Sequence, residues 1–151
     1  MNLIAKLLPP ANVVVGLEAS SKKRAFEQAG LLFENNHGIG RSTVFDSLFA
    51  REKLGSTGLG QGIAIPHGRI KGLKEARGAF VRLHEPVAFD APDGKPVAQV
   101  FVLLVPEQAT DLHLQLLSEL AQMFSERAFR DRLASAKDPH DLLALFSAWE
   151  P

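Results

Sequence analysis

Two stretches in the N-terminal third of the chain carry apolar residues at the spacing of an amphipathic helix. In the first, Ser20 or Ser21 can cap the start and Gly38 lies at the stop. The second stretch predicts a helix from the cap Ser42 to about Arg51. The inward-facing positions of the two helices are Ala25, Phe26, Ala29, Leu32, Phe33, Val44, Phe45, Leu48 and Phe49.

The middle of the chain changes to short runs of apolar and β-branched residues that are bounded by turn formers. Such runs are typical of strands, and they cover residues 13–15, 62–65, 79–83, 87–89 and 97–105. Pro66 ends the second run. The last run is apolar at nearly every position, which indicates a central strand covered on both faces.

Helical patterns return at the C-terminal end. An apolar stripe, Leu116, Leu117, Leu120, Ala121 and Phe124, follows Thr110-Asp111. A shorter stretch surrounds Phe129 and Leu133, and Asp138-Pro139 supplies a cap and a first-turn proline for the last helix. Because helices precede, interrupt and follow the strands, we predict a single-domain α/β sandwich over residues 1–151, with a mixed parallel and antiparallel sheet flanked by helices.

Composition narrows the classes of function. The 151 residues include 17 Lys and Arg and 17 Asp and Glu, so the formal net charge is zero. The chain therefore has no general positive charge that would attract nucleic acid. No apolar run reaches membrane-spanning length, so we expect no membrane insertion. The absence of cysteine excludes disulfides, thiolate metal sites and cysteine nucleophiles, and it fits a cytoplasmic protein.

Residues 51–69 form the densest irregular segment, with four glycines between positions 55 and 62. Such a loop lets backbone N–H groups approach an anion closely. Ser56, Thr57 and Gly58 are the expected phosphate contacts, and Arg51 and Arg69 add positive charge. The P-loop spacing is absent, and a plain surface connection is an equally good interpretation of the glycines alone.

Two histidines occupy positions suited to chemistry. His67 follows a buried strand and Pro66, with Gly68 leaving its ring uncrowded. His113 opens the helix after the central strand, where the helix dipole favours a neutral imidazole that can donate to a phosphoryl oxygen. From position alone, an ordinary histidine without a task is the better interpretation of each. The remaining histidines, His37, His84 and His140, are interpreted as structural or solvated.

Metal and hydrolase chemistry find little support in the sequence. No HExxH motif or tight His/Asp cluster supplies a third metal ligand. No GxSxG motif is present for a serine nucleophile. We therefore predict no metal and no cofactor.

The segments REKLGSTGLGQGIAIPHG and DLHLQLLSELA closely resemble the enzyme IIA proteins of the mannitol/fructose class of the phosphotransferase system, and most closely the stand-alone nitrogen-regulatory enzyme IIA. The resemblance implies one enzyme IIA type-2 domain over residues 1–151. It implies that His67 is phosphorylated, that His113 is the second site histidine and that Arg51 belongs to the site. The expected donor is a histidine phosphocarrier protein, and the expected targets are regulated proteins such as sensor kinases or transporters.

Two alternatives stay open at this point. A sugar-specific enzyme IIA would pass the phosphoryl group to a fructose- or mannitol-type enzyme IIB, and an interaction module would not be phosphorylated at all. For the carrier, we expect Nε2 of His67 to accept the phosphoryl group while a backbone or side-chain acceptor holds Nδ1. The partner surface is expected to surround His67. Its charged rim consists of Arg51, Lys53, Arg69 and Lys71, and its apolar groups come from Phe45, Leu48 and Phe49, some of which must instead be core.

Overall fold

The computed structural model describes residues 2–151 and contains a mixed sheet of six strands. The strands are β1 (Val13–Leu17), β2 (Gly58–Gly60), β3 (Ile63–Ala64), β4 (His67–Ile70), β5 (Arg77–Val87) and β6 (Val97–Pro106). Their order is β1-β5-β6-β3-β2, and β4 also pairs with β6. The β5–β6 and β2–β3 pairs are antiparallel, and the other pairs are parallel.

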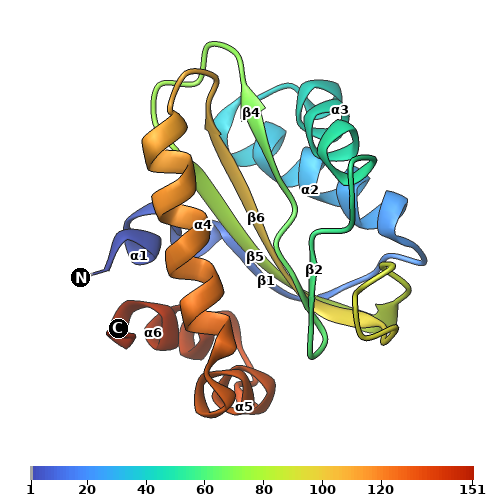
Figure 1. Cartoon of the computed structure of the whole chain (residues 1–151), viewed down its shortest axis with the longest axis vertical. Coiled ribbons are helices and arrows are strands. Elements are labelled where there is room, and N and C mark those ends of the chain that lie inside the picture. The colour runs from blue at the N-terminus through green and yellow to red at the C-terminus, as the bar shows by residue number, and fades with distance from the viewer. Residues whose placement is uncertain (1) are drawn as a thin grey trace.

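Helices cover both faces of this sheet (Figure 1). They are α1 (Leu3–Leu7), α2 (Lys22–His37), α3 (Arg41–Glu52), α4 (Thr110–Ser125), α5 (Arg127–Ser135) and α6 (Pro139–Ala148), with a 3-10 turn at Pro10–Asn12. One apolar core lies between the sheet and α1, α4, α5 and α6, and a second lies between the sheet and α2 and α3. The predicted fold class is therefore confirmed.

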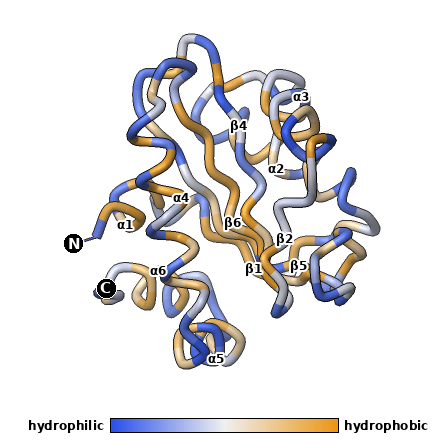
Figure 2. Tube along the Cα trace, viewed as in Figure 1, coloured by the Kyte–Doolittle hydropathy of each residue, from blue (hydrophilic) through white to orange (hydrophobic). Residues whose placement is uncertain are grey.

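The central strand β6 explains the two cores. Phe101, Leu103 and Val105 point into the core beside α4, whereas Val102 and Leu104 point into the core beside α2 and α3. Alternate residues of a strand face opposite sides, so a strand buried on both faces must be apolar throughout. Figure 2 shows most of β6 as hydrophobic, running through the middle of the molecule.

Most helix boundaries follow the predicted caps. The side chain of Ser21 accepts a hydrogen bond from Arg24 N and Gly38 closes α2 in the left-handed conformation, both as expected. Asp138 likewise caps α6 by accepting from Asp141 N. The cap predicted for α3, Ser42, was wrong, because this helix begins at Arg41 with no side-chain cap; its end at Glu52 agrees with the prediction.

Two strand predictions also need correction. The runs at 79–83 and 87–89 belong to one strand, β5, which bulges against β6 between Arg82 and Val87 and ends before Phe89. The run at 62–65 pairs only over Ile63–Ala64. The short helix α1 was not predicted, since its apolar residues span too few turns to show a period. In the described part of the chain, no helix is both long and apolar enough to span a membrane.

Candidate functional site

His67 is the first residue of strand β4. The prediction from the sequence that it lies in a loop was wrong. It is paired in register with Leu103 of β6, and Leu103 N donates to Pro66 O at 3.0 Å. Among the described residues, β4 pairs only with β6, so His67 lies at an open edge of the sheet. Because Leu103 faces the core beside α4, the ring of His67 points to the same side, and it is only 7% exposed.

A backbone carbonyl fixes the orientation and the tautomer of His67. Nδ1 lies 2.7 Å from Ile65 O. A carbonyl oxygen can only accept, so Nδ1 must carry the hydrogen and donate it. The lone pair of the neutral ring is then on Nε2. Ile65 O is thus the backbone acceptor that we predicted for Nδ1.

His113 lies in the first turn of α4 and reaches His67 across the edge of the sheet. The two ring centroids are 5.3 Å apart, and the ring planes meet at 73°. Its backbone N donates to Ala109 O at 2.9 Å, which starts the hydrogen bonding of α4. Its Nε2 is buried and has no hydrogen-bond partner within residues 2–151. A buried polar atom without a partner suits a site that a ligand completes.

The surroundings of both rings favour the neutral form. Burial is the main cause that lowers the pKa of His67, and the nearby charge of Arg51 lowers it further, while the Ile65 carbonyl and Glu52 act in the opposite direction. Burial also lowers the pKa of His113, with further contributions from His67, Arg69 and Arg51. Two neutral imidazoles beside arginine charges form a site that attracts an anion.

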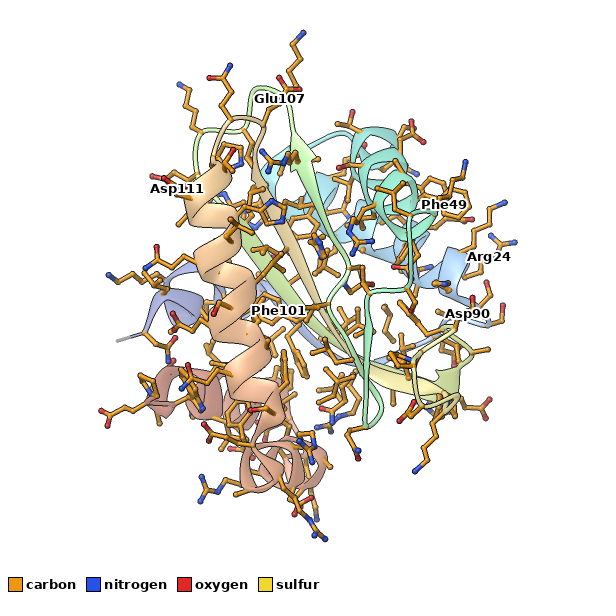
Figure 3. The ribbon with its side chains drawn as sticks, in the orientation of Figure 1. Arg24, Phe49, Asp90, Phe101, Glu107 and Asp111 are labelled. Atoms are coloured by element: carbon orange, nitrogen blue, oxygen red, sulfur yellow. The ribbon has the colours of Figure 1, made fainter. Side chains whose placement is uncertain are left out.

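Each arginine is held by one backbone carbonyl. Arg51, in the last turn of α3, donates from Nη1 to Gly55 O at 2.8 Å. Arg69, on β4, donates from Nη1 to Glu107 O at 2.9 Å. Figure 3 shows Glu107 and Asp111 at the same end of the molecule, where the connection from β6 enters α4. Since a guanidinium has five N–H donors, each arginine keeps donors for a bound anion.

Gly68 lets α3 pack directly on β4. A Cβ at this position would lie 2.1 Å from Ser47 Oγ and 3.0 Å from Ser47 Cβ. The Ser47 hydroxyl donates to Arg69 O at 3.0 Å and joins the two elements. The glycine is therefore required by the close approach of helix and strand, rather than by the space around the histidine ring that we had predicted.

The predicted phosphate contacts Ser56, Thr57 and Gly58 lie in the glycine-rich segment, but protein acceptors already use their donors. The Ser56 hydroxyl donates to Phe89 O at 2.7 Å, and Gly58 N donates to Ser56 Oγ at 3.0 Å. Thr57 donates from both N and Oγ1 to Glu52. The phosphate-binding role of these three residues stays a prediction.

Sequence reasoning missed Glu52, the buried partner of Thr57. Its signal was present in the sequence, since it lies beside Arg51 in the REK segment. A glutamate at a helix end is ordinarily read as solvated, and only the fold reveals its burial. No group of three or more His, Asp or Glu side chains that could hold a metal occurs within residues 2–151.

Comparisons with known proteins match most of the chain. The family model described as "Phosphoenolpyruvate-dependent sugar phosphotransferase system, EIIA 2" matches residues 6–149. A nitrogen regulatory protein of Pseudomonas aeruginosa is 48% identical over 134 residues, which cover 88% of this chain and 87% of that protein. The Escherichia coli nitrogen regulatory protein is 39% identical over 135 residues, covering 89% and 83%.

Solved structures show the same fold. The crystal structure of nitrogen regulatory protein IIA-Ntr from Neisseria meningitidis has a TM-score of 0.90 at 54% identity, covering 95% of this chain and 99% of that one. Enzyme IIAMTL of Escherichia coli, in its complex with phosphorylated enzyme IIBMTL, has a TM-score of 0.78 at 23% identity, covering 95% and 100%. The chain therefore belongs to the EIIA 2 family of the phosphoenolpyruvate-dependent sugar phosphotransferase system.

Proposed function

We propose that this protein is a phosphocarrier in which Nε2 of His67 accepts a phosphoryl group from a histidine phosphocarrier protein. The observation that carries the proposal is the hydrogen bond from His67 Nδ1 to Ile65 O at 2.7 Å, because it leaves the Nε2 lone pair as the nucleophile. Burial lowers the pKa of His67, so the ring is neutral and nucleophilic at neutral pH.

The transfer step needs little covalent chemistry from the protein. The Nε2 lone pair forms a bond to phosphorus as the bond from phosphorus to the donor's ring nitrogen breaks, and that electron pair returns to the donor ring. Nδ1 of His67 keeps its hydrogen, so the phosphorylated ring becomes positively charged. The Ile65 carbonyl accepts from this ring and stabilises it.

Charge on the phosphoryl oxygens must be stabilised during transfer. His113 offers one N–H, since its lowered pKa favours a neutral ring with a single hydrogen. On the tautomer that carries this hydrogen on Nε2, the unpartnered buried atom becomes a donor toward the phosphoryl group. Arg51 supplies charge close enough to affect both rings. Prepositioned donors of this kind favour the transition state over the free reactants.

We further propose a regulatory output for the carrier. Two relatives that cover most of this chain are named nitrogen regulatory proteins. On this basis the phosphorylation state of His67 would control regulated targets such as sensor kinases or transporters. The second candidate is a sugar-specific enzyme IIA, favoured by a fructose-specific EIIA component of Haloferax volcanii that is 37% identical over 97 residues. Such a protein would pass its phosphoryl group to an enzyme IIB.

One reconstitution tests these candidates. The protein is incubated with phosphoenolpyruvate, enzyme I and each candidate phosphocarrier protein, and its mass is followed with time. A histidine-bound phosphoryl group is expected, and a protein that remains unmodified with every donor would be an interaction module instead. A chase with fructose- or mannitol-type enzyme IIB separates the two carriers, since rapid loss of label to enzyme IIB contradicts a purely regulatory output.

A further inference from the structure

Glu52 is a buried carboxylate that the transfer chemistry does not use. Its side chain is only 3% exposed. Oε1 accepts from Thr57 Oγ1 at 2.6 Å, and Oε2 accepts from Thr57 N at 3.0 Å and from Lys22 Nζ at 3.1 Å. Both oxygens thus have partners, as a buried charge requires. A solvated glutamate at the end of α3 would avoid the cost of burial, so its burial calls for a reason.

Few side chains hold the turn that Glu52 closes. Residues 53–56 connect α3 to the glycine-rich segment, and Leu54 within them is 84% exposed. Backbone hydrogen bonds from Leu54 N to Arg51 O and from Gly55 N to Glu52 O, each 3.1 Å, close the turn locally. The side-chain hydrogen bonds that anchor it are those of Arg51 to Gly55 O, Glu52 to Thr57 and Ser56 to Phe89 O. Two consecutive side chains at the end of α3 therefore hold the turn together.

Lys22 ties the carboxylate to the rest of the fold. Its Nζ also donates to Phe89 O at 3.2 Å, contacts Asp90 Oδ2 at 3.2 Å and lies 5.1 Å from the centroid of the Phe89 ring. It thereby joins the start of α2, the end of α3 and the connection between β5 and β6. Asp90 is largely exposed, so Glu52 is the buried partner of this lysine.

We propose that Glu52 is a positioning residue for phosphoryl transfer: its buried carboxylate, neutralised by Lys22, clasps Thr57 and so holds the Arg51 guanidinium in place beside His67 and His113. Glu52 makes no hydrogen bond to either histidine. It acts through the turn, because Arg51 is the preceding residue and donates to Gly55 O within the clasped segment. The inference rests on the proposed function of His67.

The same geometry assigns a structural task to Thr57. Its hydroxyl and its backbone N–H both donate to the carboxylate of Glu52, five residues earlier in the chain. This pair of hydrogen bonds restricts the conformation of the turn. Reacting groups misplaced by about 1 Å can cost about 100-fold in rate. Loosening this clasp is therefore expected to slow transfer while the acceptor His67 stays intact.

The test compares Glu52→Gln and Thr57→Val with two matched controls. Glu52→Gln keeps the size and one acceptor but loses the charge, and Thr57→Val keeps the shape but loses the hydroxyl. Thr57→Ser retains the hydroxyl, and Asp90→Asn removes the exposed partner of Lys22 at a position, φ 56°, that asparagine tolerates. We expect transfer to slow about 10- to 100-fold in the first two variants. Asp90→Asn should keep the rate of the unmodified chain, and Thr57→Ser, which restores the hydroxyl, should be faster than Thr57→Val.

A second readout needs no donor protein. The charge of Glu52 raises the pKa of His67, so Glu52→Gln should move the NMR titration midpoint of the His67 ring to lower pH. Circular dichroism checks that each variant is folded, and Thr57→Val carries the test if Glu52→Gln does not fold. An unchanged transfer rate in a folded Thr57→Val or in a folded Glu52→Gln would overturn the inference, and so would an unchanged His67 midpoint in a folded Glu52→Gln. An unmodified chain that is never phosphorylated would instead contradict the proposed function.

Discussion

At the scale of the residue, Arg51 and His113 are the side chains that we propose assist phosphoryl transfer at His67. The buried Nε2 of His113 has no partner within residues 2–151, and the charge of Arg51 acts on both rings. We predict that His113→Ala and Arg51→Ala each slow phosphorylation of His67 by about 10- to 1000-fold without removing the acceptor. Rapid-quench measurement of the phosphorylated fraction checks this. Wild-type rates in both variants would mean that neither side chain contacts the phosphoryl group.

The same rings should make folding sensitive to acid. Burial lowers the pKa of His67 and of His113 in the folded protein, and it also lowers that of His37. Below the ordinary histidine pKa of about 6.5, the unfolded chain therefore binds protons that the folded chain does not. Their contribution to stability is present above this pH and is lost as the pH falls through the lowered values.

Urea unfolding between pH 7.5 and pH 5 measures this dependence. We expect the free energy of unfolding to decrease as the solution is acidified, and to decrease less in His113→Gln, which cannot take up the proton. His140→Gln is the control, because His140 is exposed in the first turn of α6. Equal pH slopes in all three proteins would contradict the assignment of the sensitivity to the site.

At the scale of the element, the contact of α3 with β4 sets the spacing of the site. Gly68→Ala would bring a Cβ to 2.1 Å from Ser47 Oγ, so the helix or the strand must shift. We predict a loss of stability of about 1–3 kcal/mol and slower transfer, because the shift separates Arg51 from His67.

Compensation by a second change tests this interpretation of Gly68. Ser47→Ala in the Gly68→Ala chain removes the closest atom, Oγ, and should recover part of both losses; the neighbouring Ser47 Cβ, 3.0 Å from the added Cβ, limits the recovery. Thermal unfolding and transfer rates measure the two effects. A Gly68→Ala protein as stable and as fast as the original would show that the close approach has no role.

Elements with strong periodicity could be predicted from the sequence, and contacts between elements could not. The helical spacing of apolar residues in α2 and the apolar run of β6 each predicted which residues are buried. In contrast, β4 has four residues and no periodic signal, so His67 was assigned to a loop. The clasp between Glu52 and Thr57 and the hydrogen bond from Nδ1 to Ile65 O depend on how the chain turns in space, which residue types alone do not specify.

At the scale of the whole molecule, exposed apolar residues occur on segments next to the site residues in the sequence, where we predict the partner surface. Leu54 and Leu59 lie on the glycine-rich side, and Leu112 and Leu114 lie at the start of α4. Of the apolar groups first considered for this surface, Leu48 is in the core, whereas Phe45 and Phe49 stack with centroids 5.5 Å apart. Figure 3 shows Phe49 on α3. Such a surface suits brief encounters with a carrier.

Surface charge should therefore affect the association rate of the two proteins more than it affects the rate of the chemical step. We predict that transfer slows as salt rises, and that Lys71→Glu lowers the association rate while the chemical step is unchanged. Arg69→Glu should lower it further, because Arg69 also holds Glu107 O. Lys137→Glu, far along the chain beyond α5, is the control. Stopped-flow rates that change neither with salt concentration nor with charge reversal at Arg69 or Lys71 would exclude electrostatic steering at the surface around His67.

The central claim is that one nitrogen of one histidine carries the phosphoryl group. The direct measurement phosphorylates the protein with phosphoenolpyruvate, enzyme I and a histidine phosphocarrier protein, and locates the group by mass spectrometry and nitrogen NMR of the imidazole. The His67 ring is buried, so His67→Ala should cost about 1–3 kcal/mol of stability and needs a check of folding. We predict a single phosphoryl group on Nε2 of His67 and none in folded His67→Ala. Attachment at Nδ1, or phosphorylation that persists in His67→Ala, would contradict it.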